Sequence, residues 1–216
     1  MAYDHFGAPI KSTEVALAAF ADAVESVKSH PFSGTAFMKP ATTLPAVRVA
    51  SSSVRDPMLA ATNLASQLSH EHLGCVLFFC SAEYDLGRLG SALEHSFQGV
   101  RVCGCTSAGE ITPDGYGRGY ITAIGFDSRY FAIDCALIRE LDRFTLQDAQ
   151  GVIDGLLSTC RDARLAPVKG NTFAITLLDG LSSREELVLA TLNSALGTIP
   201  QFGGSAGDDE RLANTH

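Results

Sequence analysis

Two segments of the chain carry the same order of sequence features, and this repeat is the strongest constraint on the fold. Residues 76–110 and 173–209 each begin with an apolar run and continue through a polar loop and an amphipathic stretch. Each then reaches a second apolar run and ends in a glycine motif, GCTSAGE or GGSAGDD. Strand, helix and strand in this order form a βαβ unit with parallel strands. The repeat therefore predicts two such units, each ending in a glycine-rich loop.

The remaining elements are predicted from their periodicity. The runs CVLFFC (75–80) and FAITLL (173–178) are typical of strands buried on both faces. Two further strands, at 121–126 and 130–138, are separated by only three residues, which predicts a hairpin. We therefore expect an α/β fold with a mixed, mainly parallel sheet covered by helices. Other strands are expected at 46–51, 100–103 and 200–202, and helices at 58–68, 86–97, 146–160 and 185–196.

The N-terminal region carries the weakest pattern. Residues 13–28 are rich in alanine, which favours a short helix. Residues 30–43 contain two prolines and a glycine and resemble a linker. We therefore expect a peripheral arm and linker over 1–43, followed by one domain over 44–216.

Charge and cysteine content exclude several classes of function. A net charge of −8 and a pI near 5.1 argue against non-specific binding of nucleic acid, which needs a basic face. No apolar run is long enough to span a membrane, and the N-terminus does not resemble a signal peptide. The six cysteines lie mostly inside apolar runs, which favours reduced thiols and a cytoplasmic protein.

The two glycine motifs are the candidate ligand site. Ligands of open α/β sheets bind beyond the carboxyl ends of the strands, where both motifs are expected. Successive backbone N–H groups there can form a concavity for an anion, although tight turns for close packing explain glycine equally well. The candidate ligand-binding residues are Gly104, Cys105, Thr106, Ser107, Gly109, Glu110, Asp179, Gly203, Gly204, Ser205, Gly207 and Asp208.

Neither catalysis nor a metal centre is predicted. Glu110 and the pair Asp208 and Asp209 hold equivalent places in the two motifs and could converge on an amine, a metal or a proton, or each could bond neighbouring backbone N–H groups. No histidine lies in the glycine or strand-end motifs to act as the base for a nucleophile, so we expect a protein that is not an enzyme, and an enzyme of unknown reaction is the lower alternative. Cys103 and Cys105 share one strand face, but zinc would need two more ligands; small buried side chains explain them better.

Four stretches together resemble a known family. CVLFFCS with the following YD, GCTSAGEITPDGY, LLDGL and FGGSAGDD resemble the FIST domain, a bacterial sensory module. The resemblance runs from about residue 47 to the end of the chain and covers the N-terminal FIST part. The family pattern normally continues into a further domain, and this chain stops at His216, so we expect a chain truncated before the C-terminal FIST domain.

The resemblance implies a role in signal transduction. Proteins of this family are thought to bind small polar ligands such as amino acids and to regulate a histidine kinase, a methyl-accepting protein or a cyclic-dinucleotide enzyme. Some members resemble haem-binding nitric-oxide sensors of two-component systems, which gives haem b as an alternative; otherwise no cofactor is predicted. His216 and His95 are the candidate axial ligands for that alternative, and the absence of C-x-x-C-H excludes covalent attachment.

Overall fold

The computed structural model describes residues 12–20, 45–112 and 115–207. In this part of the chain the helices are α1 (Pro57–Leu68), α2 (Leu86–Ser96), α3 (Leu146–Asp162) and α4 (Glu185–Leu196), with a short 3-10 helix at Leu141–Arg143. The strands are β1 (Ser12–Phe20), β2 (Val47–Ser52), β3 (Leu73–Ser81), β4 (Arg101–Ser107), β5 (Glu110–Thr112), β6 (Gly115–Gly117), β7 (Ile121–Asp127), β8 (Phe131–Arg139), β9 (Thr172–Asp179) and β10 (Gln201–Ala206).

The strands form two four-stranded sheets and one small hairpin. One sheet has the order β2-β7-β3-β4 and the other the order β10-β9-β1-β8, while β5 pairs with β6. In each large sheet one pair is parallel, β3 with β4 and β9 with β10, and the other two pairs are antiparallel. The two sheets therefore share one topology, in which β7 and β1 hold equivalent places.

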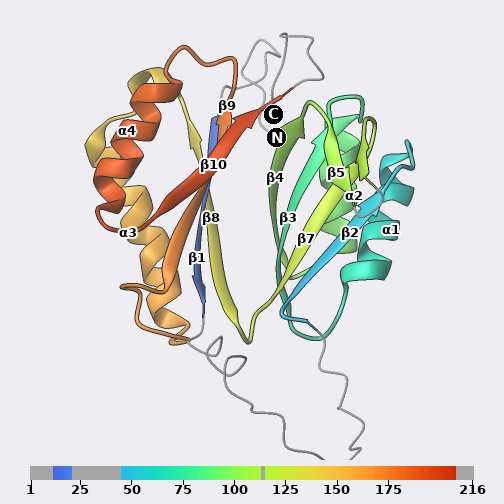
Figure 1. Ribbon diagram of the computed structural model, residues 1–216, viewed down its shortest axis with the longest axis horizontal. Helices are drawn as coiled ribbons and strands as arrows, with labels where there is room; N and C mark the ends of the chain where they lie inside the picture. Colours follow the sequence, from blue (N-terminus) through green and yellow to red (C-terminus); the bar gives the residue numbers. More distant parts are fainter. Residues whose placement is uncertain (1–11, 21–44, 113–114, 208–216) are drawn as a thin grey trace, which may run out of the picture.

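The molecule has four layers, helices, sheet, sheet and helices (Figure 1). Helices α1 and α2 pack on the outer face of the β2-β7-β3-β4 sheet, around Leu64, Val76 and Leu93. Helices α3 and α4 cover the second sheet in the same way, around Leu17, Ile153 and Leu192. These two outer cores hold most of the fully buried side chains, and their burial supplies most of the stabilisation.

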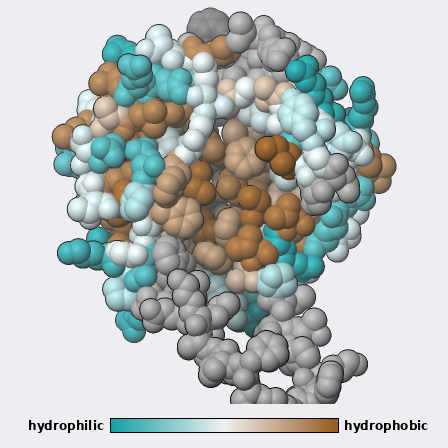
Figure 2. Space-filling model, in the orientation of Figure 1, coloured by the Kyte–Doolittle hydropathy of each residue, from teal (hydrophilic) through white to brown (hydrophobic). Residues whose placement is uncertain are grey.

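A third apolar layer lies between the two sheets. It contains Cys75 and Leu77 of β3, Cys103 of β4 and Leu177 of β9. Phenylalanine and isoleucine side chains pack around it only partly buried, and Figure 2 shows apolar surface gathered in the hollow between the sheets. The inner faces are thus covered less completely than the outer ones.

The expectation of a mainly parallel sheet is wrong. The βαβ units exist as predicted, since β3-α2-β4 and β9-α4-β10 each give a parallel pair. However, β7 inserts antiparallel between β2 and β3, and β1 inserts antiparallel between β8 and β9. Each sheet is therefore mostly antiparallel.

The predicted hairpin between β7 and β8 is also wrong. The two strands exist, but β7 pairs with β2 and β3 while β8 pairs with β1. Their short link crosses from one sheet to the other. Asp127 fixes this crossing, because its buried carboxylate accepts hydrogen bonds from the backbone N–H and the guanidinium of Arg129.

The predicted helix over 13–28 is wrong where the structure describes it. Residues Ser12–Phe20 form β1, which pairs with β8 on one side and β9 on the other. Val15, Leu17 and Ala19 face the helices and are buried, so this part of the chain is a central strand and no peripheral arm. Residues 21–28 lie outside the described part, and the domain boundary after residue 43 stays a prediction.

Helix starts follow local chemistry. Asp56 caps α1 by accepting a hydrogen bond from the backbone N–H of Leu59, and Pro57 takes the first helical position, as expected for that residue pair. Thr145 and Asp148 form a capping box at the start of α3. Among the described residues no helix is long and apolar enough to cross a membrane.

Candidate functional site

The two glycine motifs meet where the parallel strand pairs end. The backbone N–H of Gly207 donates a hydrogen bond to the carbonyl oxygen of Thr106, with a nitrogen–oxygen distance of 3.1 Å. A Cβ added to Gly207 would lie 2.8 Å from the backbone nitrogen of Ala108. Glycine is therefore needed for the two motifs to approach so closely, and the structure brings together segments far apart in the sequence.

Gly104 and Gly203 hold equivalent places in the two sheets. A Cβ on Gly104 would lie 2.0 Å from the carbonyl oxygen of Phe78, its partner on β3. A Cβ on Gly203 would lie 1.9 Å from the carbonyl oxygen of Thr176, its partner on β9. The repeat seen in the sequence is thus a repeat of backbone geometry, and both glycines allow close strand pairing.

Glu110 is built into the first motif as a buried carboxylate. Its side chain accepts a 2.8 Å hydrogen bond from the hydroxyl of Ser107 and a 3.1 Å bond from the backbone N–H of Tyr120. Only 1% of the residue is exposed. The sequence left open whether Glu110 binds a ligand or bonds neighbouring groups of the protein. This geometry matches the second alternative, in which the carboxylate stabilises the loop around it.

The hairpin β5–β6 covers the first motif. Tyr116 places its hydroxyl over Gly109, where an added Cβ would lie 2.1 Å from that oxygen, and donates a hydrogen bond to the carbonyl oxygen of Ala108. Thr106 is buried, and Cys105 belongs to the apolar layer between the sheets. The first motif is therefore closed at Cys105, Thr106 and Glu110, which are buried, whereas Ala108 is exposed.

Asp179 ends β9 beside the second motif. It pairs in register with Ala206, and its carboxylate accepts a hydrogen bond from the backbone N–H of Leu181. A Cβ on Gly180 would lie 2.6 Å from the carbonyl oxygen of Ala206, so this loop also packs closely on β10. Asp208 lies outside the described residues.

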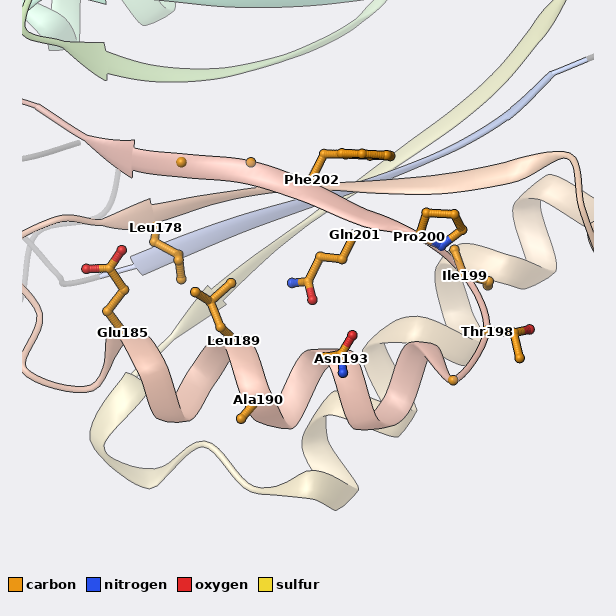
Figure 3. Close-up of a pocket in the computed structure, with 13 residues that line it drawn as sticks. Leu178, Glu185, Leu189, Ala190, Asn193, Thr198, Ile199, Pro200, Gln201 and Phe202 are labelled. Atoms are coloured by element: carbon orange, nitrogen blue, oxygen red, sulfur yellow. The ribbon is translucent and has the colours of Figure 1, made fainter.

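A groove opens between α4 and β10, with a volume of about 620 Å³ (Figure 3). The polar side chains on its two walls are Glu185 and Asn193 from α4 and Gln201 from β10. Gly203 and Gly204 of the second motif line it as well. The remaining lining residues are Leu178, Leu189, Ala190, Gly197, Thr198, Ile199, Pro200 and Phe202.

The groove exists because β10 carries little side-chain volume. Side chains alternate along a strand, so Gln201, Gly203 and Ser205 face α4. Gly203 lines the groove with backbone atoms, since a Cβ there would meet β9, and the hydroxyl of Ser205 donates to the carboxylate of Glu185 instead of filling the groove. Figure 3 shows Gln201 pointing from β10 toward α4, and Leu189 and Asn193 pointing from α4 toward β10.

The residues of α4 that line this groove were not predicted from the sequence. Nothing in the local pattern distinguishes Glu185 and Asn193 from other polar residues of a surface helix. Their position beside the second motif follows only from the way α4 lies along β10. Of the predicted site residues, Gly203 and Gly204 line the groove, whereas Thr106, Ser107 and Glu110 form the closed junction beside it.

The candidate haem ligand His95 does not line this groove. His95 is exposed in the last turn of α2, on the opposite side of the two sheets from α4 (Figure 1). A basic residue there complements the partial negative charge of the helix end. His216 lies outside the described residues, and haem binding stays a prediction from the resemblance.

A family model matches residues 74–216, and it is that of the FIST N domain. The chain belongs to the FIST N domain family. Neither a curated protein nor a solved structure matches it.

The FIST N domain is a sensory domain, and the matched residues contain the features described above. The match begins within β3 and includes both glycine motifs, α4 and β10. The strands β1 and β2 and the helix α1 precede it, although β1 and β2 complete the two sheets. The resemblance was expected to begin at about residue 47, which is earlier than the start of the matched segment at residue 74.

Proposed function

We propose that this FIST N domain senses a small polar ligand that carries an ammonium group, such as an amino acid, in the groove between α4 and β10. The observation that carries this proposal is the groove itself, of about 620 Å³, beside a carboxylate and two glycines. Ligand pockets for small molecules have volumes of roughly 300–1,000 Å³ and combine apolar walls with a few polar groups. The groove has this composition.

The polar groups suit the two ends of an amino acid. The carboxylate of Glu185 is the acceptor for an ammonium group, since a charged hydrogen bond is stronger than a neutral one. β10 lies at the edge of its sheet, where backbone N–H groups can point away from the neighbouring strand toward a ligand carboxylate. The amides of Asn193 and Gln201 can donate or accept, and Leu189, Ile199 and Pro200 supply an apolar wall.

The position of β10 provides a route for the signal. The strand ends at the hydrogen bond between Gly207 and Thr106, which joins the two sheets. A ligand that binds one arrangement of this junction better than another shifts the population of the two. We propose that a signalling partner in the cytoplasm, a histidine kinase or a cyclic-dinucleotide enzyme, reads that shift, and that the domain binds its ligand without catalysing a reaction.

The test is a thermal-shift screen with amino acids, and with amines and carboxylic acids that each match one half of an amino acid. We expect an amino acid to raise the unfolding midpoint more than either half does. In Glu185→Gln the shift should be lost. Glu186→Gln is the matched control, because Glu186 lies in the same helical turn, is exposed and does not line the groove.

Two outcomes contradict the proposal. The first is a full panel of amino acids and amines that leaves the midpoint of the folded protein unchanged. The second is a stabilising compound whose effect survives Glu185→Gln as completely as Glu186→Gln.

A further inference from the structure

Three cysteine side chains from three strands meet between the two sheets. Cys75 lies on β3, Cys103 on β4 and Cys135 on β8, and their sulfur atoms all lie within 4.8 Å of one another. The first two strands belong to one sheet and the third to the other. The cluster is distinct from the groove between α4 and β10 and carries an inference of its own.

We propose that Cys75, Cys103 and Cys135 form a binding site for a trivalent thiophilic ion of the arsenite class. The spacing of the sulfur atoms suits a three-coordinate centre. Arsenic(III) bound to three thiolates is a trigonal pyramid, in which bonds of about 2.3 Å at angles of about 100° place the sulfurs roughly 3.5 Å apart, so modest rotations of the side chains suffice. A tetrahedral zinc site would require a fourth ligand, which the cluster does not supply.

Charge decides which thiophilic ion the site accepts. Cys75 and Cys103 are 2% and 3% exposed, and the surrounding side chains are apolar, among them Leu77, Leu177 and Ile133. Three thiolates around Cu(I) would leave two negative charges in this environment, which is costly. Arg101 lies near Cys135, but its charge is balanced by the ion pair with Asp134.

Two of the three thiols, those of Cys103 and Cys135, have a pKa above its ordinary value. Hydrogen bonds with Cys135 and then Cys75, followed by burial, raise the pKa of Cys103. For Cys135 the bond with Cys103 lowers the pKa, but the bond with Cys75 and burial outweigh it and raise the pKa to about 12. A ligand that takes neutral thiols and leaves a neutral product therefore has the advantage.

Arsenite meets this requirement without any change of oxidation state. In each of three steps an As–O bond of As(OH)₃ breaks and an As–S bond forms. The thiol proton leaves with the hydroxide as water, so three thiols and As(OH)₃ give one neutral As(SR)₃ group and three waters. Cys135 is partly exposed and offers the point of entry.

The bound ion would join β8 covalently to β3 and β4. Because these strands belong to different sheets, we expect arsenite to raise the unfolding midpoint as well as to bind. This second readout reports on the folded protein, independently of any signalling activity.

The test is native mass spectrometry of the reduced protein with arsenite, with the ultraviolet absorption of As–S bonds and the unfolding midpoint measured in parallel. We expect one arsenic atom to be gained and three hydrogens lost, together with a higher midpoint. Cys103→Ala and the less buried Cys135→Ala should lose at least tenfold in affinity. Cys105→Ala is the matched control, since Cys105 is buried on the same strand face but lies outside the cluster.

Three results would overturn the proposal. They are a folded wild-type protein that gains no arsenic, an adduct that persists equally in Cys103→Ala and Cys135→Ala, and an adduct lost equally in Cys105→Ala. A Cu(I) titration tests the charge argument, because Cu(I) bound at the three cysteines in preference to arsenite would overturn the choice of ion.

Discussion

The backbone N–H of Gly207 is hydrogen-bonded to the carbonyl oxygen of Thr106, and this bond joins the ends of β10 and β4. The two residues belong to the two glycine motifs, which terminate the parallel pairs of different sheets. Contact between the halves of the molecule at this edge therefore depends on backbone atoms, and one of the two residues, Gly207, carries no side chain.

Gly207→Ala should destabilise the protein by about 1–3 kcal/mol, the usual cost of an added carbon in a closely packed place. The new Cβ would lie 2.8 Å from the backbone nitrogen of Ala108, so one motif must move. Denaturant unfolding measures the loss. Gly204→Ala is the control, because nothing lies within 4 Å of the added carbon; equal stability of the two variants would contradict the prediction.

Glu110→Ala should cost about 2–3 kcal/mol of stability, because it leaves the hydroxyl of Ser107 and the backbone N–H of Tyr120 without this acceptor. Glu110→Gln should lose less than half as much, since its amide oxygen can still accept from Tyr120. Both are measured by chemical denaturation. If Glu110→Gln instead keeps full stability but abolishes the response to a stabilising amino acid, Glu110 belongs to the ligand site and not to the loop.

The buried carboxylate of Asp127 should make the free energy of unfolding depend on pH. Hydrogen bonding to Arg129 lowers the pKa of the Asp127 carboxyl. A carboxyl with a lower pKa in the folded state contributes stability above the ordinary aspartate pKa of about 4, and this contribution is lost as the pH falls toward the lowered pKa. Asp127→Asn should be less stable at pH 7, and the difference from wild type should shrink below about pH 4. A difference that grows on acidification would contradict this assignment.

Gly151→Ala and Gly155→Ala should each stabilise the protein by about 0.5–1 kcal/mol. Both glycines lie in α3, are exposed, and have nothing within 4 Å of an added Cβ. Gly197→Ala is the contrasting variant, because its Cβ also meets nothing but its φ is +63° at the end of α4. We expect Gly197→Ala to lower the free energy of unfolding by about 1 kcal/mol. Thermal unfolding should therefore show a higher midpoint for the two α3 variants and a lower one for Gly197→Ala.

Much of the helix and strand content could be predicted because periodicity is local. The βαβ units and the buried strands β3 and β9 follow from residues close together in the sequence. The place of β1 could not be found in this way. Alanine favours helix, whereas pairing with β8 and β9 on both sides imposes a strand. The alternation of Val15, Leu17 and Ala19 on one face is the local signal that supports it.

The candidate site was predictable only in part for a related reason. Glycine motifs at strand ends indicate close backbone approach, and the contacts of Gly104, Gly203 and Gly207 have this character. The sequence does not tell which side of the strand stays open. That depends on how α4 lies along β10 and where it places Glu185, which is a matter of tertiary packing.

The position of β1 in the second sheet has a consequence for the order in which the protein folds as it is made. The strands of the β2-β7-β3-β4 sheet leave the ribosome one after another, so that sheet can close early. β1 leaves before all of them, yet its partners β8 and β9 are synthesised only after that whole sheet. The apolar stretch from Val15 to Ala19 therefore waits unpaired while most of the chain is translated, and a long loop must close before it is buried. Slow translation of the second half would prolong the interval in which a chaperone or an aggregate can capture this strand.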